Sequence, residues 1–147
     1  MTKQDIHTRC VAFVDRKIKE HQDSLNEMHE SKVYETKSSA GDKFETSTEM
    51  IQQEEDKIRR MLMQALKMKQ DLSQLPDSES KEIGPGTLVR TNFGDYYMSI
   101  GLGKIPGTRD AIFCISMGSP LGMAFKGKVA GMFAEVNGRE FIIKEVL

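Results

Sequence analysis

Two carboxylates in the first half of the sequence have the types and the spacing to do chemistry. Asp42 and Glu45 stand three positions apart, at the end of a small, polar stretch that begins at Lys37. On the first turn of a helix, residues at this spacing share a face and can jointly present oxygens to a divalent cation. The same pair also forms a capping box, in which the side chains satisfy free backbone N–H groups. Both roles are compatible, and two carboxylates are too few ligands to hold Mg²⁺ without a partner.

Between the carboxylates lie Lys43 and Phe44. Phe44 is exposed at this place unless it packs on Tyr34 across the turn. The sequence therefore leaves two roles for Phe44, which are local packing and contact with a partner.

Two helices are needed to position this pair. From Asp5 to about Tyr34 the chain has no Pro or Gly, and apolar residues recur alternately three and four positions apart. This spacing is typical of a helix that packs one narrow stripe on a partner, and it returns after the polar break. We therefore expect an antiparallel α-helical coiled-coil hairpin over residues 1–75, with its tip near 37–46. The stripe residues are Val11, Val14, Ile18, His21, Leu25 and Met28, then Ile51, Glu54, Ile58, Met61, Ala65, Met68, Leu72 and Leu75.

The second half of the chain changes to the period of strands. Pro76 and Gly84-Pro85-Gly86 bound an expected linker over 76–86. After it, alternating apolar residues predict strands at 88–91, 96–100, 111–115, 133–136 and 139–143. Asn137-Gly138 between the last two favours a type I′ hairpin turn. The prediction for 87–147 is an antiparallel sheet with one short helix, which makes the whole chain α+β.

The short helix is predicted from its ends. Ser119 is a preferred N-cap residue, Pro120 suits the first helical position, and Gly127 follows the last turn. Leu121 and Gly122 then belong to the first turn. These residue types are explained by helix start and packing rather than by a nucleophilic serine, because the three histidines, His7, His21 and His29, all lie on the first helix.

Composition excludes several classes of protein. The chain has 21 basic and 22 acidic residues, so bulk positive charge does not hold it on nucleic acid. Cys10 and Cys114 form no Cys-x-x-Cys pair, so we expect reduced thiols and neither a disulfide framework nor a zinc site. Gly101-x-Gly103 lacks the third glycine of a dinucleotide site. No window approaches the roughly 18 apolar residues that span a bilayer, and we expect a soluble, cytoplasmic protein.

The second half resembles a known family. Ser119-Pro120-Leu121-Gly122, followed by Gly127-Lys128 and Gly131, is similar to the C-terminal signature of the bacterial Gre-type transcript cleavage factors. That family has an FKBP-like second domain and an N-terminal coiled coil with a glycine-aspartate pair at its tip, followed three residues later by glutamate. Gly41-Asp42 and Glu45 match that motif. The resemblance covers nearly the whole chain.

The resemblance implies a function through bacterial RNA polymerase. The second domain would dock on the rim of the secondary channel through Ser119, Pro120, Leu121 and Gly122, while the hairpin reaches the active site. There Asp42 and Glu45 would coordinate Mg²⁺ jointly with polymerase, beside the 3′ end of the nascent RNA, and Lys43 and Phe44 would make tip contacts. We expect a monomer, although an exposed stripe could also pair between chains, and we do not expect a free-standing enzyme, because two carboxylates are too few ligands.

Departures from the family pattern leave alternatives open. Thr46 stands where the family usually has asparagine after the tip glutamate, and Gly131-Met132 stands where the family has glycine-aspartate. One alternative is a channel-binding regulator without cleavage activity. Another is a coiled-coil interaction module unrelated to polymerase.

Overall fold

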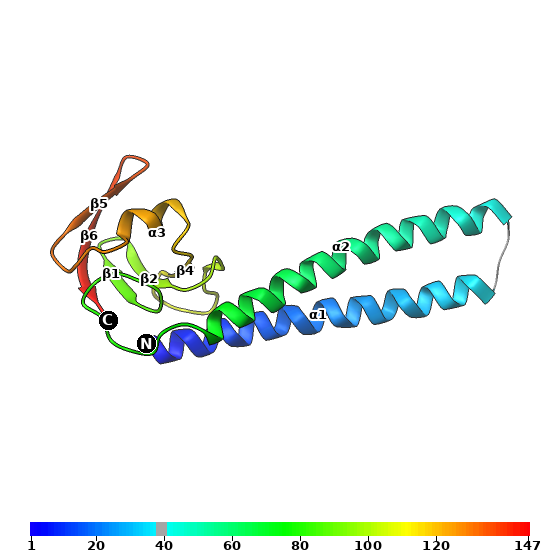
Figure 1. Ribbon diagram of the computed structural model, residues 1–147, viewed down its shortest axis with the longest axis horizontal. Coiled ribbons are helices and arrows are strands. Elements are labelled where there is room, and N and C mark those ends of the chain that lie inside the picture. Colours follow the sequence, from blue (N-terminus) through cyan, green and yellow to red (C-terminus); the bar gives the residue numbers. More distant parts are fainter. Residues whose placement is uncertain (38–40) are drawn as a thin grey trace. The chain divides into compact units, whose positions relative to one another are not determined.

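The computed structural model describes residues 1–37 and 41–147, with side chains described for 1–31 and 48–147. The chain forms two compact units, of which one is Phe13–Lys69 and the other combines Met1–Ala12 with Gln70–Leu147. Figure 1 labels most of the elements. They are α1 (Lys3–Lys37), α2 (Gly41–Ser73), β1 (Leu88–Thr91), β2 (Gly94–Met98), β3 (Gly103–Lys104), β4 (Ile112–Ile115), α3 (Pro120–Phe125), β5 (Phe133–Val136) and β6 (Arg139–Val146).

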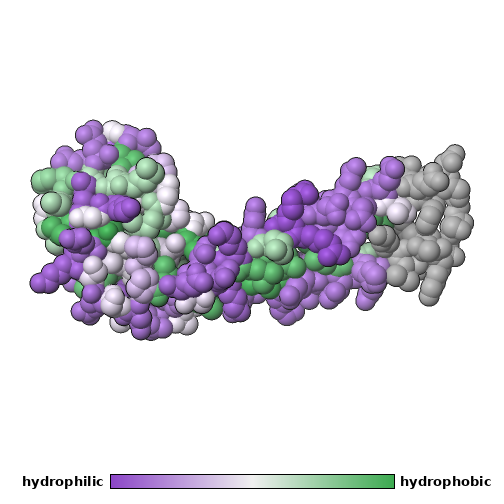
Figure 2. Space-filling view, in the orientation of Figure 1, coloured by the Kyte–Doolittle hydropathy of each residue, from purple (hydrophilic) through white to green (hydrophobic). Residues whose placement is uncertain are grey.

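The first unit is an antiparallel pair of helices, as predicted. Asp15, early in α1, forms an ion pair with Lys69, late in α2, at 2.7 Å between Oδ1 and Nζ. Val14 and Ile18 of α1 and Ala65 of α2 are buried. Most of the hairpin surface seen in Figure 2 is hydrophilic, with hydrophobic residues confined to a few areas. The packing of one narrow apolar stripe therefore holds the two helices together.

The stripe of α2 differs from the predicted one at two positions, while Ile51, Ile58 and Ala65 keep their predicted places. Glu55, only 6% exposed, takes the buried place expected for Glu54, and its carboxylate accepts a hydrogen bond from Arg59 at 2.7 Å. Leu62 is half-buried, whereas Met61, expected in the stripe, is 41% exposed. The predicted places of Glu54 and Met61 are therefore wrong. Glu54 is next to Glu55, and Met61 is next to the apolar Leu62. The alternating three-and-four spacing can therefore be drawn through either residue of each pair.

The second unit is built on a six-stranded sheet with the strand order β3-β4-β2-β1-β6-β5. Most neighbours are antiparallel, as predicted, but β2 and β4 pair in parallel, with Tyr97 opposite Cys114. The predicted antiparallel sheet is therefore confirmed in most of its pairs, with β2 and β4 as a parallel pair. Residues 99–111 return the chain before β4 begins, and a connection of about a dozen residues allows parallel pairing. The short, exposed β3 was not predicted.

The conformation of two turn residues explains the hairpin that β5 and β6 form at one edge of the sheet. Asn137 and Gly138 join β5 to β6 and both have positive φ, at 53° and 77°. A type I′ turn requires this conformation at both central residues, and its twist matches that of the flanking strands. The predicted hairpin is confirmed, and β6 extends beyond the expected end to Val146.

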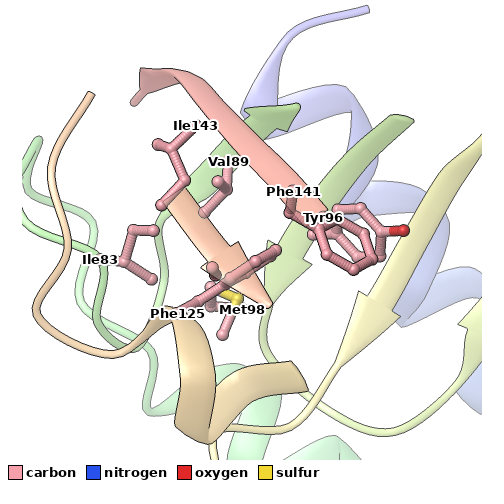
Figure 3. Close-up of a cluster of buried hydrophobic side chains, with 8 residues drawn as sticks. Ile83, Val89, Tyr96, Met98, Phe125, Phe141 and Ile143 are labelled. Carbon is pink, nitrogen blue, oxygen red and sulfur yellow. The ribbon is translucent and has the colours of Figure 1, made fainter. Parts of the chain in front are cut away.

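An aromatic cluster fastens α3 to the sheet. Phe125, the last residue of α3, is 0% exposed, and its ring meets Phe141 edge-on at 5.5 Å and Tyr96 at 5.6 Å between centroids. Figure 3 shows these rings with Met98 and the aliphatic side chains around them. The other buried members of this cluster are Ile83, Val89, Ala134 and Ile143.

No helix in the described part of the chain is long and apolar enough to cross a membrane.

Removal of the Phe125 ring should destabilise the protein strongly. We expect Phe125→Ala to lower the free energy of unfolding by about 3–5 kcal/mol, because it leaves a cavity among the neighbouring rings. Met123→Ala is the matched control on the same helix, since Met123 is 67% exposed. The control should change stability by no more than about 0.5 kcal/mol. Urea unfolding of both variants measures the difference, and equal effects would contradict the assigned role of Phe125.

Candidate functional site

The predicted metal pair belongs to the turn end of the hairpin. Helix α1 ends at Lys37 and α2 begins at Gly41, so Asp42 and Glu45 fall within the first two turns of α2. The side chains of Asp42, Lys43, Phe44 and Glu45 lie outside the described residues, and their metal, capping and contact roles stay predictions. Among the residues that are described, no group of three or more His, Cys, Asp or Glu side chains could hold a metal ion.

The second predicted site, at the start of α3, is described in full. The Ser119 hydroxyl accepts a hydrogen bond from the Gly122 N–H at 3.0 Å and donates one to the Ser116 carbonyl at 2.7 Å. Pro120 occupies the first turn, where it needs no N–H partner. The Ser119 oxygen is therefore engaged as a helix cap, and it lies in no nucleophile–base arrangement.

Gly122 allows the close approach of α3 to the preceding loop. A Cβ atom at this position would lie 2.2 Å from the Ser116 carbonyl oxygen and 3.0 Å from backbone atoms of Met117. Because these neighbours are backbone atoms, no side-chain movement relieves the clash. The Ser-Pro-Leu-Gly run thus has a structural basis in one cap and one tight contact.

An open depression of about 480 Å³ lies beside this helix start. It brings together the predicted residues Ser119, Pro120 and Leu121 with residues of β2 and the β5–β6 hairpin. Gly122 is buried behind it and does not line it. The remaining lining residues are Tyr96, Ile115, Val136, Asn137, Arg139 and Phe141.

One cation and several rings set the chemistry of the depression. The Arg139 guanidinium lies 4.8 Å from the centroid of the Phe93 ring, an arrangement in which the charge is held over a π face. Burial raises the pKa of the Tyr96 phenol, and the positive charge of Arg139 acts in the opposite direction. The phenol is thus neutral at physiological pH and available for hydrogen bonding.

The arrangement is suited to binding rather than to bond cleavage. It offers apolar surface, one exposed guanidinium and the Asn137 amide at the edge. Such a combination fits a protein segment that has apolar and acidic side chains.

Sequence reasoning missed six of the nine residues that line this surface. Tyr96, Asn137, Arg139 and Phe141 come from segments that were predicted only as strands and a turn. The Asn137-Gly138 signal placed a hairpin correctly, but sheet order decides that β6 lies beside β1, and this order is not visible in the local sequence.

Comparison with known proteins gives solved structures only, since no family model and no curated protein matches the sequence. One similar structure is described as the transcription factor Gfh1, which is 18% identical over 93% of this chain and 92% of its own, with a TM-score of 0.37. The GreA factor homolog 1 of Thermus thermophilus has the same identity and TM-score and covers 93% and 94%. Gfh1 of Thermus aquaticus is 16% identical over 95% and 94%, also with a TM-score of 0.37.

A methyl group at Gly122 should be poorly tolerated. We expect Gly122→Ala to reduce the free energy of unfolding by about 3 kcal/mol, because α3 must move away from the Ser116 carbonyl. Gly118→Ala is the matched control from the same loop, since a Cβ there meets no atom within 4 Å. It should stay within about 0.5 kcal/mol of the unmodified protein. Thermal or urea unfolding reports the difference, and a neutral Gly122→Ala would refute the tight contact.

Proposed function

We propose that this chain is a Gre-like elongation factor. In this proposal it binds bacterial RNA polymerase in the cytoplasm through the secondary channel and stimulates Mg²⁺-dependent cleavage of backtracked transcripts. The observation that carries the proposal is the position of the Gly41-Asp42 and Glu45 motif at the turn of a two-helix hairpin.

The length of the helices suits this role. They contain 35 and 33 residues, so each extends about 50 Å at 1.5 Å per residue. In the described part of the hairpin, an internal apolar stripe lies between the helices, and most of the surface seen in Figure 2 is hydrophilic. A hairpin of this kind can enter an aqueous channel of a large partner and deliver its turn to a distant site.

The donor set at the turn fits Mg²⁺ because carboxylate oxygens are ligands that this ion prefers. Asp42 and Glu45 would supply part of the coordination shell, and the polymerase and the RNA phosphate would supply the rest. The chemistry that Mg²⁺ would supply at Asp42 and Glu45 is activation of water and neutralisation of charge on the scissile phosphate. The chain alone is not an enzyme in this proposal, because it provides two ligands and no complete site.

The sheet domain supplies the docking surface in the proposal. The depression beside α3 combines the Ser119–Leu121 segment with Arg139 and exposed ring edges. An acidic and apolar segment at the rim of the polymerase channel would be complementary to it.

A regulator that occupies the channel without cleavage is the second candidate. The observation that favours it is the sequence after Glu45, where Thr46 replaces the usual asparagine and Met50 is 66% exposed. Met132, exposed after α3, also replaces a family carboxylate. Under this alternative the tip carboxylates act mainly as a helix cap.

The tip carboxylates are tested in a stalled, backtracked elongation complex. We expect wild type to shorten the RNA from its 3′ end, and Asp42→Ala or Glu45→Ala to reduce the rate on the order of 100-fold, because each removes a metal ligand. Glu54→Ala is the matched control, since it removes the same charge from an exposed position of α2. Binding of wild type without cleavage would select the regulator.

Docking is tested separately by affinity capture of core RNA polymerase. The double variant Pro120→Ala and Arg139→Ala should weaken binding about tenfold or more, because it removes the exposed proline ring and the guanidinium from the depression. Met123→Ala changes an exposed residue of α3 that does not line the depression and should bind as wild type does. Failure of wild type to bind polymerase would reject both candidate functions and favour an unrelated coiled-coil module.

A further inference from the structure

Two cysteines that are far apart in the sequence meet inside the second compact unit. The sulfur of Cys10 lies 2.8 Å from the sulfur of Cys114, across 104 positions of the chain. Both are free thiols, and their residues are only 1% and 0% exposed. The sequence alone indicated two unrelated thiols, so this contact is a product of the fold.

Regular elements hold both cysteines in place. Cys10 lies one helical turn after the fully buried Ile6, so α1 directs both to the same buried face. Cys114 alternates with buried Ile112 along β4, and its backbone is fixed in register between Tyr97 of β2 and Gly103 of β3. The contact therefore does not depend on a loop.

The surroundings do not make this pair a metal centre. A structural zinc site requires four ligands, and the described residues hold no cluster of three or more His, Cys, Asp or Glu side chains. The nearby His7 already shares a hydrogen bond with the Tyr97 hydroxyl, at 2.8 Å from Nδ1. Two thiols in contact, with no further ligand, leave sulfur–sulfur chemistry.

We propose that Cys10 and Cys114 form a reversible intramolecular disulfide when the protein meets a peroxide. A disulfide has a sulfur–sulfur bond of about 2.05 Å, so the two atoms need to approach by roughly 0.8 Å. Small side-chain rotations about two fixed backbones supply a movement of this size.

The hydrogen bond between the sulfurs shifts the pKa values of the two cysteines in opposite directions. The hydrogen bond between the sulfurs, in which either atom could be the donor, lowers the pKa of Cys114, and Ser99 acts in the same direction against the effect of burial. The bond to Cys114 and burial both raise the pKa of Cys10. Cys114 is therefore the attacking thiolate and Cys10 the resolving thiol.

The reaction with hydrogen peroxide balances in two steps. The Cys114 thiolate attacks one peroxide oxygen, the O–O bond breaks, and a sulfenic acid and hydroxide are formed. The Cys10 sulfur then attacks the Cys114 sulfur, the S–O bond breaks, and the departing hydroxide leaves as water with the Cys10 proton. The two thiols lose two electrons and two protons in total, and the peroxide is reduced to two waters.

A polar pocket of about 260 Å³ lies in the same compact unit and is large enough for peroxide. Its lining includes His7, which precedes Cys10 by three positions, and Tyr97, the register partner of Cys114, but neither cysteine. Burial raises the pKa of Tyr97, and so does negative charge on Cys10 and Cys114. Peroxide in this pocket would thus contact residues that neighbour both cysteines in the sequence or in the sheet.

The disulfide would join the first turns of α1 to β4, the second strand from one edge of the sheet. It closes a loop of 104 positions, and long loops lose the most freedom in the unfolded chain when they are closed. Oxidation is therefore expected to raise the melting temperature, on the order of 10 °C.

The test uses the full-length protein and needs no polymerase, so its result is independent of the proposed function. Reduced wild type is treated with hydrogen peroxide, digested without reductant and analysed by mass spectrometry. We expect a peptide pair joined through Cys10 and Cys114, loss of both titratable thiols, the rise in melting temperature, and complete reversal by dithiothreitol. Because this measurement uses wild type, a variant that folds poorly cannot obscure it.

Cys10→Ala and Cys114→Ala are the controls. After peroxide treatment, neither should show the linked peptide or the rise in melting temperature, and only Cys10→Ala should accumulate sulfenic acid, trapped by dimedone. Three results would overturn the proposal. They are two thiols that remain titratable in wild type, oxidation of either sulfur to sulfinic acid without the linked peptide, and crosslinks found only between chains.

Discussion

The packing of Phe125 against Tyr96 and Phe141 is the interaction on which the described site depends. These rings meet edge-on, and they are the contact through which a helix of only six residues is held on the sheet. So short a helix has little stability of its own, since most helical stability in proteins comes from packing. The cap at Ser119, the close approach at Gly122 and one wall of the depression all follow from that anchor.

Much of this architecture can be predicted from the sequence, because local rules govern it. The Ser119-Pro120 start of α3, the Asn137-Gly138 turn and the two long helices each depend on neighbours in the chain. The places of Glu55 and Leu62 in the α2 stripe were not predictable, since Glu54 and Met61 offer the same character one position earlier. The parallel pairing of β2 with β4 depends on how residues 99–111 return, which no local pattern encodes.

The residues of the candidate site also differ in whether a local sequence pattern or the arrangement of distant segments brings them together. Residues 119–122 form one local motif and were found from sequence, whereas Arg139 and Tyr96 join them only through the order of the strands. Cys10 and Cys114 are the extreme case, because a helix at one end of the chain and a strand near the other must both be placed before their sulfurs meet. Asp42 and Glu45, in contrast, were predicted from their spacing and from the family resemblance, and their role stays a prediction.

The buried carboxylate of Glu55 has a consequence for how the hairpin chooses its partners. An apolar residue in its place would allow the stripe to adhere to other apolar helices, including another copy of the same hairpin. Glu55 forms an ion pair with Arg59 of its own helix, at 2.7 Å. A foreign helix laid on the stripe would have to cover this ion pair without a matching group, which is costly. A charged residue in the stripe thus lowers the stability of the helix pair and disfavours association of the hairpin with other apolar helices.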